Sequence, residues 1–346
     1  MPSGARLDSC LGKPLDAVAM GAYQRIMFRG LSRLILLPLS LASAWSQTLT
    51  NGDWVYRTNA SNEATVTAYL GTAEHVFIPE EIGGSSVRQI GNGRRPPTFG
   101  WINTTVQSVA IPDTVRVLGS LAFANCRALT NLHLPSRVTN VAPWAISGCW
   151  NLENITVDPS SQHFVAVDGV LFNKTRSVLL VYPAGKEGAY VVPASVVAIS
   201  NTAFADSVGL SSVVVGSNVT ELGYSVFYGC TQLVSILFSG PAPVGGENLF
   251  WSSLPTVFYL TGTGGWPTTF YGRPTQAFVP EVRLAELGVD ETFTFSWTNT
   301  GSIPMNVRRT TSLGGPWTVI SSNNATGQFD DPNPPSGQAF YQAYLP

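Results

Sequence analysis

The chain has 346 residues, which is enough for two or three domains of ordinary size. Only 12% of the residues are charged and the net charge is −2 at pH 7, which argues against nucleic acid or an anionic membrane surface as a partner. The 33 glycines and 24 prolines favour a β-rich extracellular protein with many turns over a helical cytosolic enzyme.

The N-terminal region is expected to carry a secretory signal. Two arginines precede an apolar run from Leu34 to Leu41, and Ala42-Ser43-Ala44 supplies the small residues that a signal peptidase needs. The apolar run is too short to span a membrane. We therefore expect an exported mature chain that begins near Trp45 and has no membrane span.

The position of the translation start is a separate question. Met27 begins a signal peptide of ordinary length, and Met20 is the other internal candidate. The alternative is that the residues from Met1 onward form a genuine long N-terminal extension of the signal.

A 23-residue period organises the middle of the chain. Cys126 and Cys149 are 23 residues apart. The same spacing separates Pro112 from Pro135, Val115 from Val138, Ala122 from Ala145, and Phe204 from Phe227. A period of this length predicts a solenoid, in which each coil buries its apolar face only by stacking on its neighbours.

Each repeat opens with a short strand of alternating character, which places one set of side chains inside the coil and the other on the surface. The expected inward set is Val109, Ile111, Leu132, Leu134, Ile155, Val157, Val213 and Val215. Val214 is among the residues expected to point outward, and the polar members of the outward set form the candidate binding surface: Ser108, Asn131, His133, Asn154, Thr156, Ser212 and Ser235. Solenoids use such surfaces for extended binding.

Each repeat then turns through a compact corner, as in Ala122-Phe123 and Val226-Phe227, where the Phe is expected to fill the coil interior. Cys126, Cys149 and Cys230 follow at one shared position and are expected to pack as small apolar groups. A disulfide between Cys126 and Cys149 in adjacent coils stays open as an alternative, although the coil spacing of about 4.8 Å requires local adjustment. Cys10 lies upstream of the signal.

Five aromatic residues flank the outward strand positions. They are Trp144, Trp150, Tyr224, Tyr228 and Trp251. Trp and Tyr beside neutral polar groups suit stacking on sugars or anchoring a protein partner. The competing interpretation is that these side chains pack between coils, as large aromatic residues usually do.

The sequence contains no evident catalytic or metal-binding constellation. The histidines after the signal, His75, His133 and His163, stand in no catalytic spacing, and the carboxylates are scattered. Glu153 and Asp158 lie near one coil edge without a feature that marks them as a pair. Asp330-Asp331 suggests either a calcium ligand or, in preference, an Asx turn before proline. We expect no enzyme, no metal and no cofactor.

The cassette AIPDTVRVLGSLAFANCRAL closely resembles the BspA-like leucine-rich repeat family. The stretch VDPSSQHFVAVDGVLFNKTRSVLLVYPAG resembles the insertion of that family and predicts two extra strands as a β-hairpin, while TVFYL with the later GW and RP resembles its closing segment. The resemblance covers about residues 64–278. It weakens over 94–105, where a corner is missing, and at Asp206-Ser207, where the Cys of the corner is replaced. Looser or decorated coils are expected at both places.

The predicted fold is mainly β: a leucine-rich-repeat solenoid of 23-residue repeats with a hairpin insertion, followed by a small β-sandwich. The predicted domains are an extension with the signal over 1–44, an N-terminal strand or cap over 45–63, the solenoid over 64–278 and the sandwich over 281–346, which is weakly similar to fibronectin-like modules. No C-terminal anchor is expected.

The resemblance implies a bacterial protein that is secreted or held at the cell surface and that binds or adheres without catalysis. The expected partner is a protein or a cell-surface glycan, and not nucleic acid. The alternative is a carbohydrate-binding accessory protein of a polysaccharide-degrading bacterium, and an extracellular enzyme is a distant third. Because many functions share one fold, the inference to function is by association.

Overall fold

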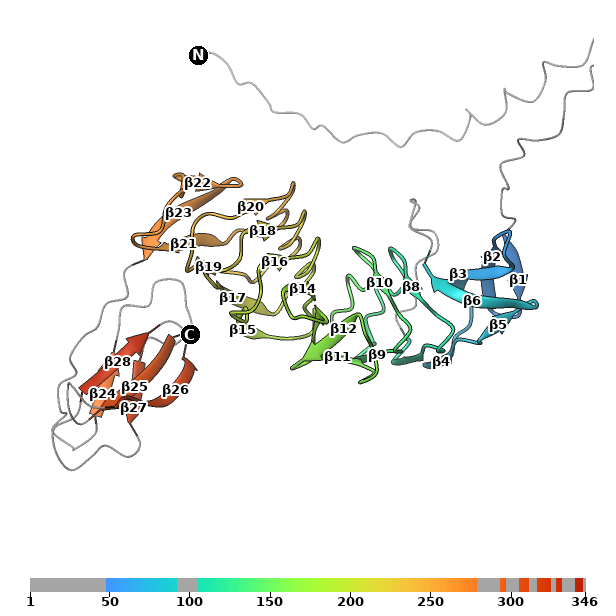
Figure 1. Cartoon of the computed structure of the whole chain (residues 1–346), viewed down its shortest axis with the longest axis horizontal. Helices are drawn as coiled ribbons and strands as arrows, with labels where there is room; N and C mark the ends of the chain where they lie inside the picture. Colours follow the sequence, from blue (N-terminus) through green and yellow to red (C-terminus); the bar gives the residue numbers. More distant parts are fainter. Residues whose placement is uncertain are drawn as a thin grey trace, which may run out of the picture. The chain divides into compact units, whose positions relative to one another are not determined.

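The computed structural model describes residues 48–91 and 105–278 together with five strands of the C-terminal region. The predicted signal and the irregular repeat over 94–105 lie outside the described residues, apart from Thr105. Contacts divide the chain into Met1–Trp45 and Ser46–Pro346, and every described element belongs to the second unit. Its coils follow one another in chain order (Figure 1).

Three antiparallel strands open the described chain. They are β1 (Leu49–Asn51), β2 (Trp54–Thr58) and β3 (Glu63–Tyr69), with β2 between the other two. Strand β3 then pairs in parallel with β6 (Ser85–Ile90), which also carries the short β5 (Glu81–Ile82). These antiparallel strands therefore cap the first coil of the solenoid, and the parallel pairing of the coils begins with β3 and β6.

Each coil contributes a first strand and a shorter second strand. The first strands of the early coils are β4 (His75–Phe77), β7 (Ser108–Ala110), β9 (Asn131–Leu134) and β11 (Asn154–Val157). The second strands, β8 (Val117–Leu118) and β10 (Asn140–Val141), extend the parallel sheet that β6 begins. In the register of β9 and β11, Asn131 pairs with Asn154 and His133 with Thr156, so equivalent repeat positions stack directly.

The predicted insertion is a hairpin, as expected. Strand β12 (Phe164–Val167) pairs antiparallel with β13 (Val170–Asn173), and β13 pairs antiparallel with β14 (Val178–Val181). Asp168 and Gly169 both have positive φ, as a tight hairpin turn requires. Strand β14 then resumes the parallel second-strand sheet.

The later coils repeat the same two sheets. The second strands are β14, β16 (Ala198–Ile199), β18 (Glu221–Leu222) and β20 (Val244–Gly245). The first strands are β15 (Gly188–Val191), β17 (Leu210–Val215), β19 (Ser235–Phe238), β21 (Thr256–Leu260) and β23 (Arg273–Phe278). Strand β22 (Thr269–Phe270) folds back on β23. The array of first strands thereby ends in an antiparallel hairpin.

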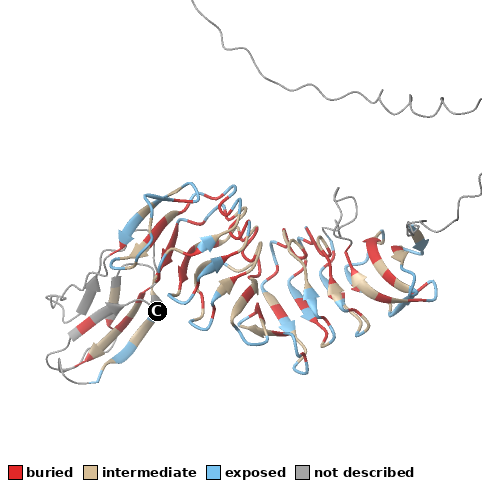
Figure 2. Cartoon of the chain, turned by 45° about the horizontal axis from the view of Figure 1, so that its top comes forward, coloured by how far each residue is buried: buried red, intermediate tan, exposed pale blue. Residues whose placement is uncertain are grey.

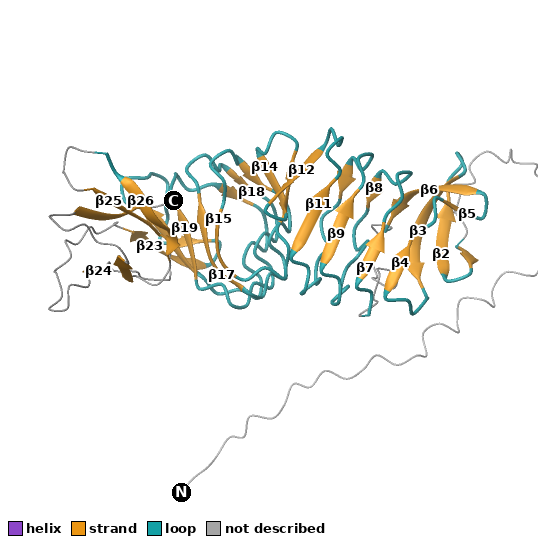
Figure 3. Ribbon diagram, turned by 90° about the horizontal axis from the view of Figure 1, so that it is seen from below, coloured by secondary structure: helices purple, strands orange, loops and turns teal. Residues whose placement is uncertain are grey.

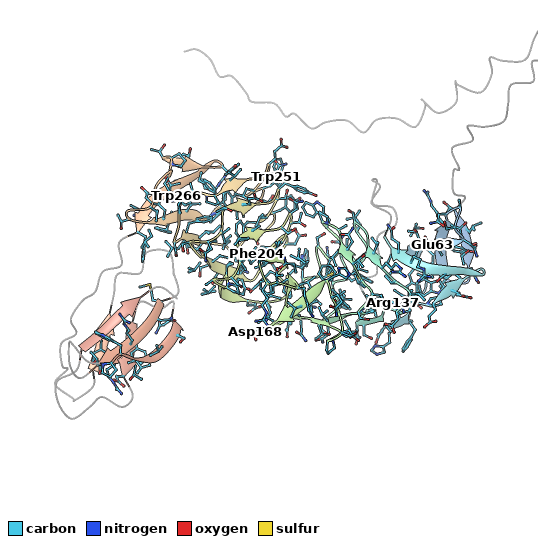
Figure 4. The ribbon with its side chains drawn as sticks, viewed as in Figure 1. Glu63, Arg137, Asp168, Phe204, Trp251 and Trp266 are labelled. Atoms are coloured by element: carbon cyan, nitrogen blue, oxygen red, sulfur yellow. The ribbon has the colours of Figure 1, made fainter. Side chains whose placement is uncertain are left out.

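The corners explain the AF motif of the sequence. Phe204 and Phe227 stack with ring centroids 5.2 Å apart, and Phe227 and Phe250 stack at 5.7 Å. All three rings lie inside the coils, where Figure 4 labels Phe204. Dispersion and removal of apolar area from water both favour this column of rings. The Phe of each repeat is therefore core, as the period predicts.

Two positions of each corner that the structure describes adopt left-handed backbone conformations, with φ between 52° and 71°. The first is occupied by Leu121, Trp144, Thr202, Ser225 and Asn248, and the second by Asn125, Gly148, Asp206, Gly229 and Ser252. Positive φ is costly for residues other than Gly. Backbone bonds between coils offset this cost, for example from Phe123 N–H to Ala145 O at 2.7 Å.

The cysteines close the corners as free, buried thiols. Cys149 Sγ donates to Phe123 O and Cys230 Sγ donates to Phe204 O, both at 3.0 Å. Burial raises the pKa of Cys230 to about 12. The interpretation of these residues as small packing groups is confirmed, and the alternative disulfide between Cys126 and Cys149 is absent.

The coil that contains Asp206 and Ser207 is not looser than the others, which corrects the expectation drawn from its missing Cys. Ser207 takes the thiol position and is fully buried, although its hydroxyl has no hydrogen-bond partner. Its neighbour Phe204 joins the ring column like its equivalents. Backbone bonds between coils, such as Asp206 N–H to Tyr228 O, hold the corner without the thiol.

Asp206 provides a pH-dependent test of this corner. Burial raises the pKa of its carboxyl above the usual 3.8, and a hydrogen bond from Gly148 N–H opposes the shift. Because the folded chain holds this proton more tightly, the stability contribution is present below pH 3.8 and is lost as the pH rises through the raised pKa. We expect Asp206→Asn to stabilise the protein at pH 7 and not at about pH 3.

Urea unfolding of Asp206→Asn at the two pH values measures this difference. The control is Asp158→Asn, because hydrogen bonds from Ser160 lower the pKa of Asp158 and reverse the sign of its pH dependence. A stability difference for Asp206→Asn that is the same at both pH values would show that this carboxyl is not perturbed.

The C-terminal region contains five described strands in two antiparallel groups. Strands β24 (Phe293–Ser296) and β27 (Gln328–Asp331) pair, and β25 (Met305–Thr310) lies between β26 (Thr318–Asn324) and β28 (Phe340–Tyr344). The short strands of this region are as the sequence predicts, whereas the likeness of the region to fibronectin modules stays a prediction. Over the described residues the chain forms strands, turns and loops, and no helix there could cross a membrane.

Candidate functional site

A polar ladder follows the first strands of the early coils. We define it by His75, Ser108, Asn131, His133, Asn154 and Thr156, which lie on β4, β7, β9 and β11. Figure 3 shows these strands side by side. All six side chains reach the surface, whereas Leu132, Leu134 and Ile155 on the same strands are buried. Buried and exposed positions alternate along the strands in Figure 2, as the pattern predicts.

Hydrogen bonds connect the ladder between coils. His75 Nδ1 and Ser108 Oγ lie 2.8 Å apart, and His133 Nδ1 and Thr156 Oγ1 lie 3.0 Å apart. The sequence spacing of 33 residues concealed the first pair, which the register of β4 and β7 brings together. Because the arrangement recurs on an open strand face, we interpret it as cross-strand pairing and not as an activated nucleophile.

The ladder ends in a depression of about 280 Å³ against the hairpin insertion. Asn154, Thr156, Asp158 and Lys174 contribute polar groups to its lining. Hydrogen bonds from Ser160 N–H and Oγ lower the pKa of Asp158, while Lys174 Nζ donates to Ser161 O at 2.6 Å. The depression thus places two hydrogen-bonded charged groups, the carboxylate of Asp158 and the ammonium group of Lys174, at one end of the polar ladder.

The pairing of Glu153 with Asp158 does not resemble a glycosidase site. Glycoside hydrolysis needs one carboxyl whose pKa is raised so that it can act as an acid. The pKa of Asp158 is instead lowered by its bonds to Ser160, and its carboxylate forms an Asx turn with that residue. The geometry therefore favours Asp158 as a structural or binding carboxylate.

Two predicted surface residues are buried. Ser212 has 1% of its surface exposed and Ser235 has none, so the expectation that they extend the ladder is wrong. Val214, expected outward, is buried as well, beside Leu237 of the next coil. Strands β17 and β19 are therefore covered on both faces, and the continuous apolar runs VVV and ILF are the sequence signal for this.

Apolar side chains cover the outward face of β17 and β19. One cluster of buried residues combines Val214, Leu237, Phe258 and Phe278 of the later coils with Met305, Val307 and Tyr341 of the C-terminal strands. Residues at outward positions of β17, β19 and β21 thus belong to a packed core. The available ladder is consequently restricted to the early coils.

The flanking aromatic residues divide into two groups. Trp144 packs edge-on against Tyr228 with centroids 5.1 Å apart, and Arg127 lies 4.1 Å above the ring of Trp150. Trp144 and Tyr228 are partly buried, as the competing interpretation holds, whereas Trp150 contacts Arg127 but stays exposed. Tyr224 and Trp251 are also exposed, at the corners of later coils, where Figure 4 labels Trp251.

Tyr224 and Trp251 border depressions that the sequence did not reveal. One, of about 760 Å³, is lined by Asn201, Glu221, Tyr224, Glu247 and Asn248 among others. A neighbouring one, of about 310 Å³, is lined by Asn248, Phe250, Trp251, Tyr271 and Arg273 among others. Tyr271 and Arg273 come from the closing hairpin, which the repeat pattern does not cover, so only the fold brings them to this edge.

Asp331 has a structural role that neither sequence interpretation anticipated. It lies within strand β27, its carboxylate accepts a hydrogen bond from Tyr341 Oη at 2.7 Å, and it pairs with the guanidinium of Arg309. A carboxylate with these two partners is satisfied without calcium. Among the described residues, no cluster of His, Cys, Asp and Glu could hold a metal ion.

Several solved structures are similar to this chain. They include a leucine-rich repeat protein from Eubacterium ventriosum (18% identity over 62% of this chain and 72% of that one, TM-score 0.37) and a leucine-rich cell surface protein from Faecalibacterium prausnitzii (19%, 66% and 94%, TM-score 0.33). The pneumococcal vaccine antigen PcpA is a third (14%, 62% and 87%, TM-score 0.32). No curated protein sequence matches the chain.

The repeats themselves match a family model. Residues 98–177 and 189–261 match the BspA-type leucine-rich repeat region in six copies. These ranges contain the corners, the ring column and the hairpin insertion described above. The chain therefore contains BspA-type leucine-rich repeats over these two ranges.

Proposed function

We propose that this protein is an exported, non-enzymatic binding or adhesion protein of a bacterial surface, and that the polar ladder contacts a protein partner. Proteins with BspA-type repeats are bacterial surface proteins, which supports a binding or adhesion role. The observation that carries the proposal is the row of polar side chains that reach the surface on four neighbouring strands, all exposed except the half-buried Asn154. Repeat solenoids bind extended partners along such rows.

The ladder has chemistry suited to a polypeptide. Its hydroxyl, amide and imidazole groups both donate and accept hydrogen bonds, so they complement backbone groups as well as polar side chains. Phe77, on β4 beside His75, has 77% of its surface exposed and offers an apolar contact at one end. The depression with Asp158 and Lys174 offers a charged pocket at the other end. One extended segment could engage all three.

A protein array tests the proposal. The chain is applied to immobilised extracellular-matrix and epithelial surface proteins, and binding is compared with that of the double variant Asn131→Arg, Thr156→Arg. Two bulky charges on adjacent strands obstruct an extended partner, so we expect the apparent Kd to rise at least about tenfold. Ser217→Arg, at an exposed turn after β17, is the matched control and should bind normally.

Two results would contradict this function. If the double variant bound the same proteins as tightly as the unmodified chain, the ladder would not be the contact surface. If the unmodified chain bound none of the immobilised proteins, protein adhesion itself would be excluded as the role. Circular dichroism of each variant establishes that the solenoid is folded.

A further inference from the structure

Three exposed aromatic side chains gather at the corners of the last coils, away from the polar ladder. We call Tyr224, Trp251 and Tyr271 the aromatic edge; their exposed fractions are 38%, 60% and 44%. Exposed aromatic rings keep apolar area in contact with water, although the ring of Tyr271 also packs edge-on against Phe270 with centroids 4.8 Å apart. Most other aromatic residues of these coils, including Phe227 and Phe250, are buried. The aromatic edge therefore differs from the other aromatic residues of the repeats, most of which are buried in the core.

Hydrogen bonds fix the ring of Tyr271 through its hydroxyl, and they fix the backbone from which the rings of Tyr224 and Trp251 project. Tyr271 Oη donates to Gly245 O at 2.5 Å and accepts from Gly245 N–H at 2.9 Å. Tyr224 N–H donates to Asn201 Oδ1 at 2.9 Å, and Trp251 N–H donates to Asn248 O at 3.2 Å. The ring of Tyr271, which is already ordered, loses little conformational entropy when a ligand covers it.

The rings border two adjoining depressions, which share Asn248. Tyr224 lines the larger depression, and Trp251 and Tyr271 line the smaller. Tyr271 also bonds to Gly245 of the larger one, so the two depressions meet at this ring. Their volumes of about 760 and 310 Å³ exceed the size of one sugar ring and suit several linked ones.

The polar groups around the rings are those that hydroxyls bind. Glu221 and Glu247 in the larger depression accept hydrogen bonds, and the Asn201 and Asn248 amides carry both donors and acceptors. Arg273 lines the smaller depression, and its Nε has no hydrogen-bond partner among the described residues. Two carboxylates in the larger depression oppose an anionic ligand.

We infer that the aromatic edge is a binding site for a neutral oligosaccharide or polysaccharide. The apolar C–H faces of sugar rings stack on Tyr224, Trp251 and Tyr271, while their hydroxyls bond to the carboxylates, amides and guanidinium around them. The site is independent of the polar ladder, since it uses the corners of the later coils and the closing hairpin. The protein thus has two binding surfaces of different chemistry.

Affinity electrophoresis of the full chain tests this inference. The gels contain one soluble polysaccharide each: xyloglucan, mixed-linkage β-glucan or galactomannan as neutral probes, and polygalacturonate as an acidic one. We expect at least one neutral polysaccharide to retard the chain. Trp251→Ala and Tyr271→Ala should each raise the apparent Kd by about tenfold or more, because each removes a stacking ring.

Matched variants separate binding from folding. Trp150→Ala removes a partly exposed Trp of an earlier coil and should retain binding. Tyr271→Phe keeps the ring but loses both bonds to Gly245, so its Kd should lie between those of the unmodified chain and Tyr271→Ala. Urea midpoints equal to that of the unmodified chain establish that the variants are folded.

Three outcomes would overturn the inference. The first is that no neutral polysaccharide retards the chain, and the second is that polygalacturonate binds more tightly than every neutral probe. The third is that Trp251→Ala and Tyr271→Ala, both folded, bind like Trp150→Ala. Retained binding in the ladder double variant would show that the two surfaces act separately, as inferred.

Discussion

Phe227→Ala is expected to lower the free energy of unfolding by about 3–5 kcal/mol, the usual cost of truncating a fully buried Phe. Phe227 is completely buried and stacks on both Phe204 and Phe250. Its removal leaves a cavity between two coils and deprives each neighbour of a contact. Because a solenoid coil is supported only by adjacent coils, the structure has little freedom to close that cavity.

Urea unfolding followed by circular dichroism measures the effect of Phe227→Ala. Phe77→Ala is the matched control, because Phe77 is also a Phe of the repeat region but is largely exposed, and its loss should change stability by no more than about 0.5 kcal/mol. Phe227→Ile reproduces the residue that Ile146 supplies in an earlier corner and should cost less than Ala. Equal stability of Phe227→Ala and Phe77→Ala would show that the ring column is not part of the core.

Gly223→Ala is expected to destabilise the solenoid by about 1–3 kcal/mol or more, through overpacking between two coils. A Cβ at this position would lie 2.6 Å from Asn201 Cα and closer still to the Asn201 backbone nitrogen. Backbone atoms of the adjacent coil cannot rotate away as a side chain can. The bond from Tyr224 N–H to Asn201 Oδ1 would be disturbed with them.

Gly216→Ala is the control for this substitution. No atom lies within 4 Å of a Cβ built there, and its φ is not positive. We expect this variant to be neutral or more stable by up to about 1 kcal/mol, since Ala restricts the unfolded chain. Thermal or urea unfolding of both variants measures the contrast. Unchanged stability of Gly223→Ala would mean that the coils separate at little cost.

The repeat period predicted most of the fold because it reports local packing. The corner positions of Phe123, Phe204 and Phe227, the burial of the cysteines and the hairpin at Asp168 all followed from residues within one or two coils. Because the coils of a solenoid contact mainly their neighbours, a repeat of 23 residues specifies most of the contacts that each coil makes. The domain boundaries and the signal region stay predictions.

Other features depend on contacts that the period does not encode. The hydrogen bond between His75 and Ser108 needs the register of β4 and β7, and the packing of Trp144 against Tyr228 joins residues separated by the insertion. The aromatic edge needs the closing hairpin to place Tyr271 beside Gly245. No regular spacing announces any of these contacts.

The sequence by itself determined which side chains point out of the coils, because alternation along a strand fixes the face of every residue. Only the tertiary structure decided which of those faces meet solvent. Ser212, Val214 and Ser235 follow the same alternation as Asn131 and His133, yet they are buried. For Val214 the difference arises because it belongs to one packed cluster with Leu237, Met305 and Val307, and the last two lie far along the chain. Burial on such a face depends on a distant partner, and a local pattern cannot report it.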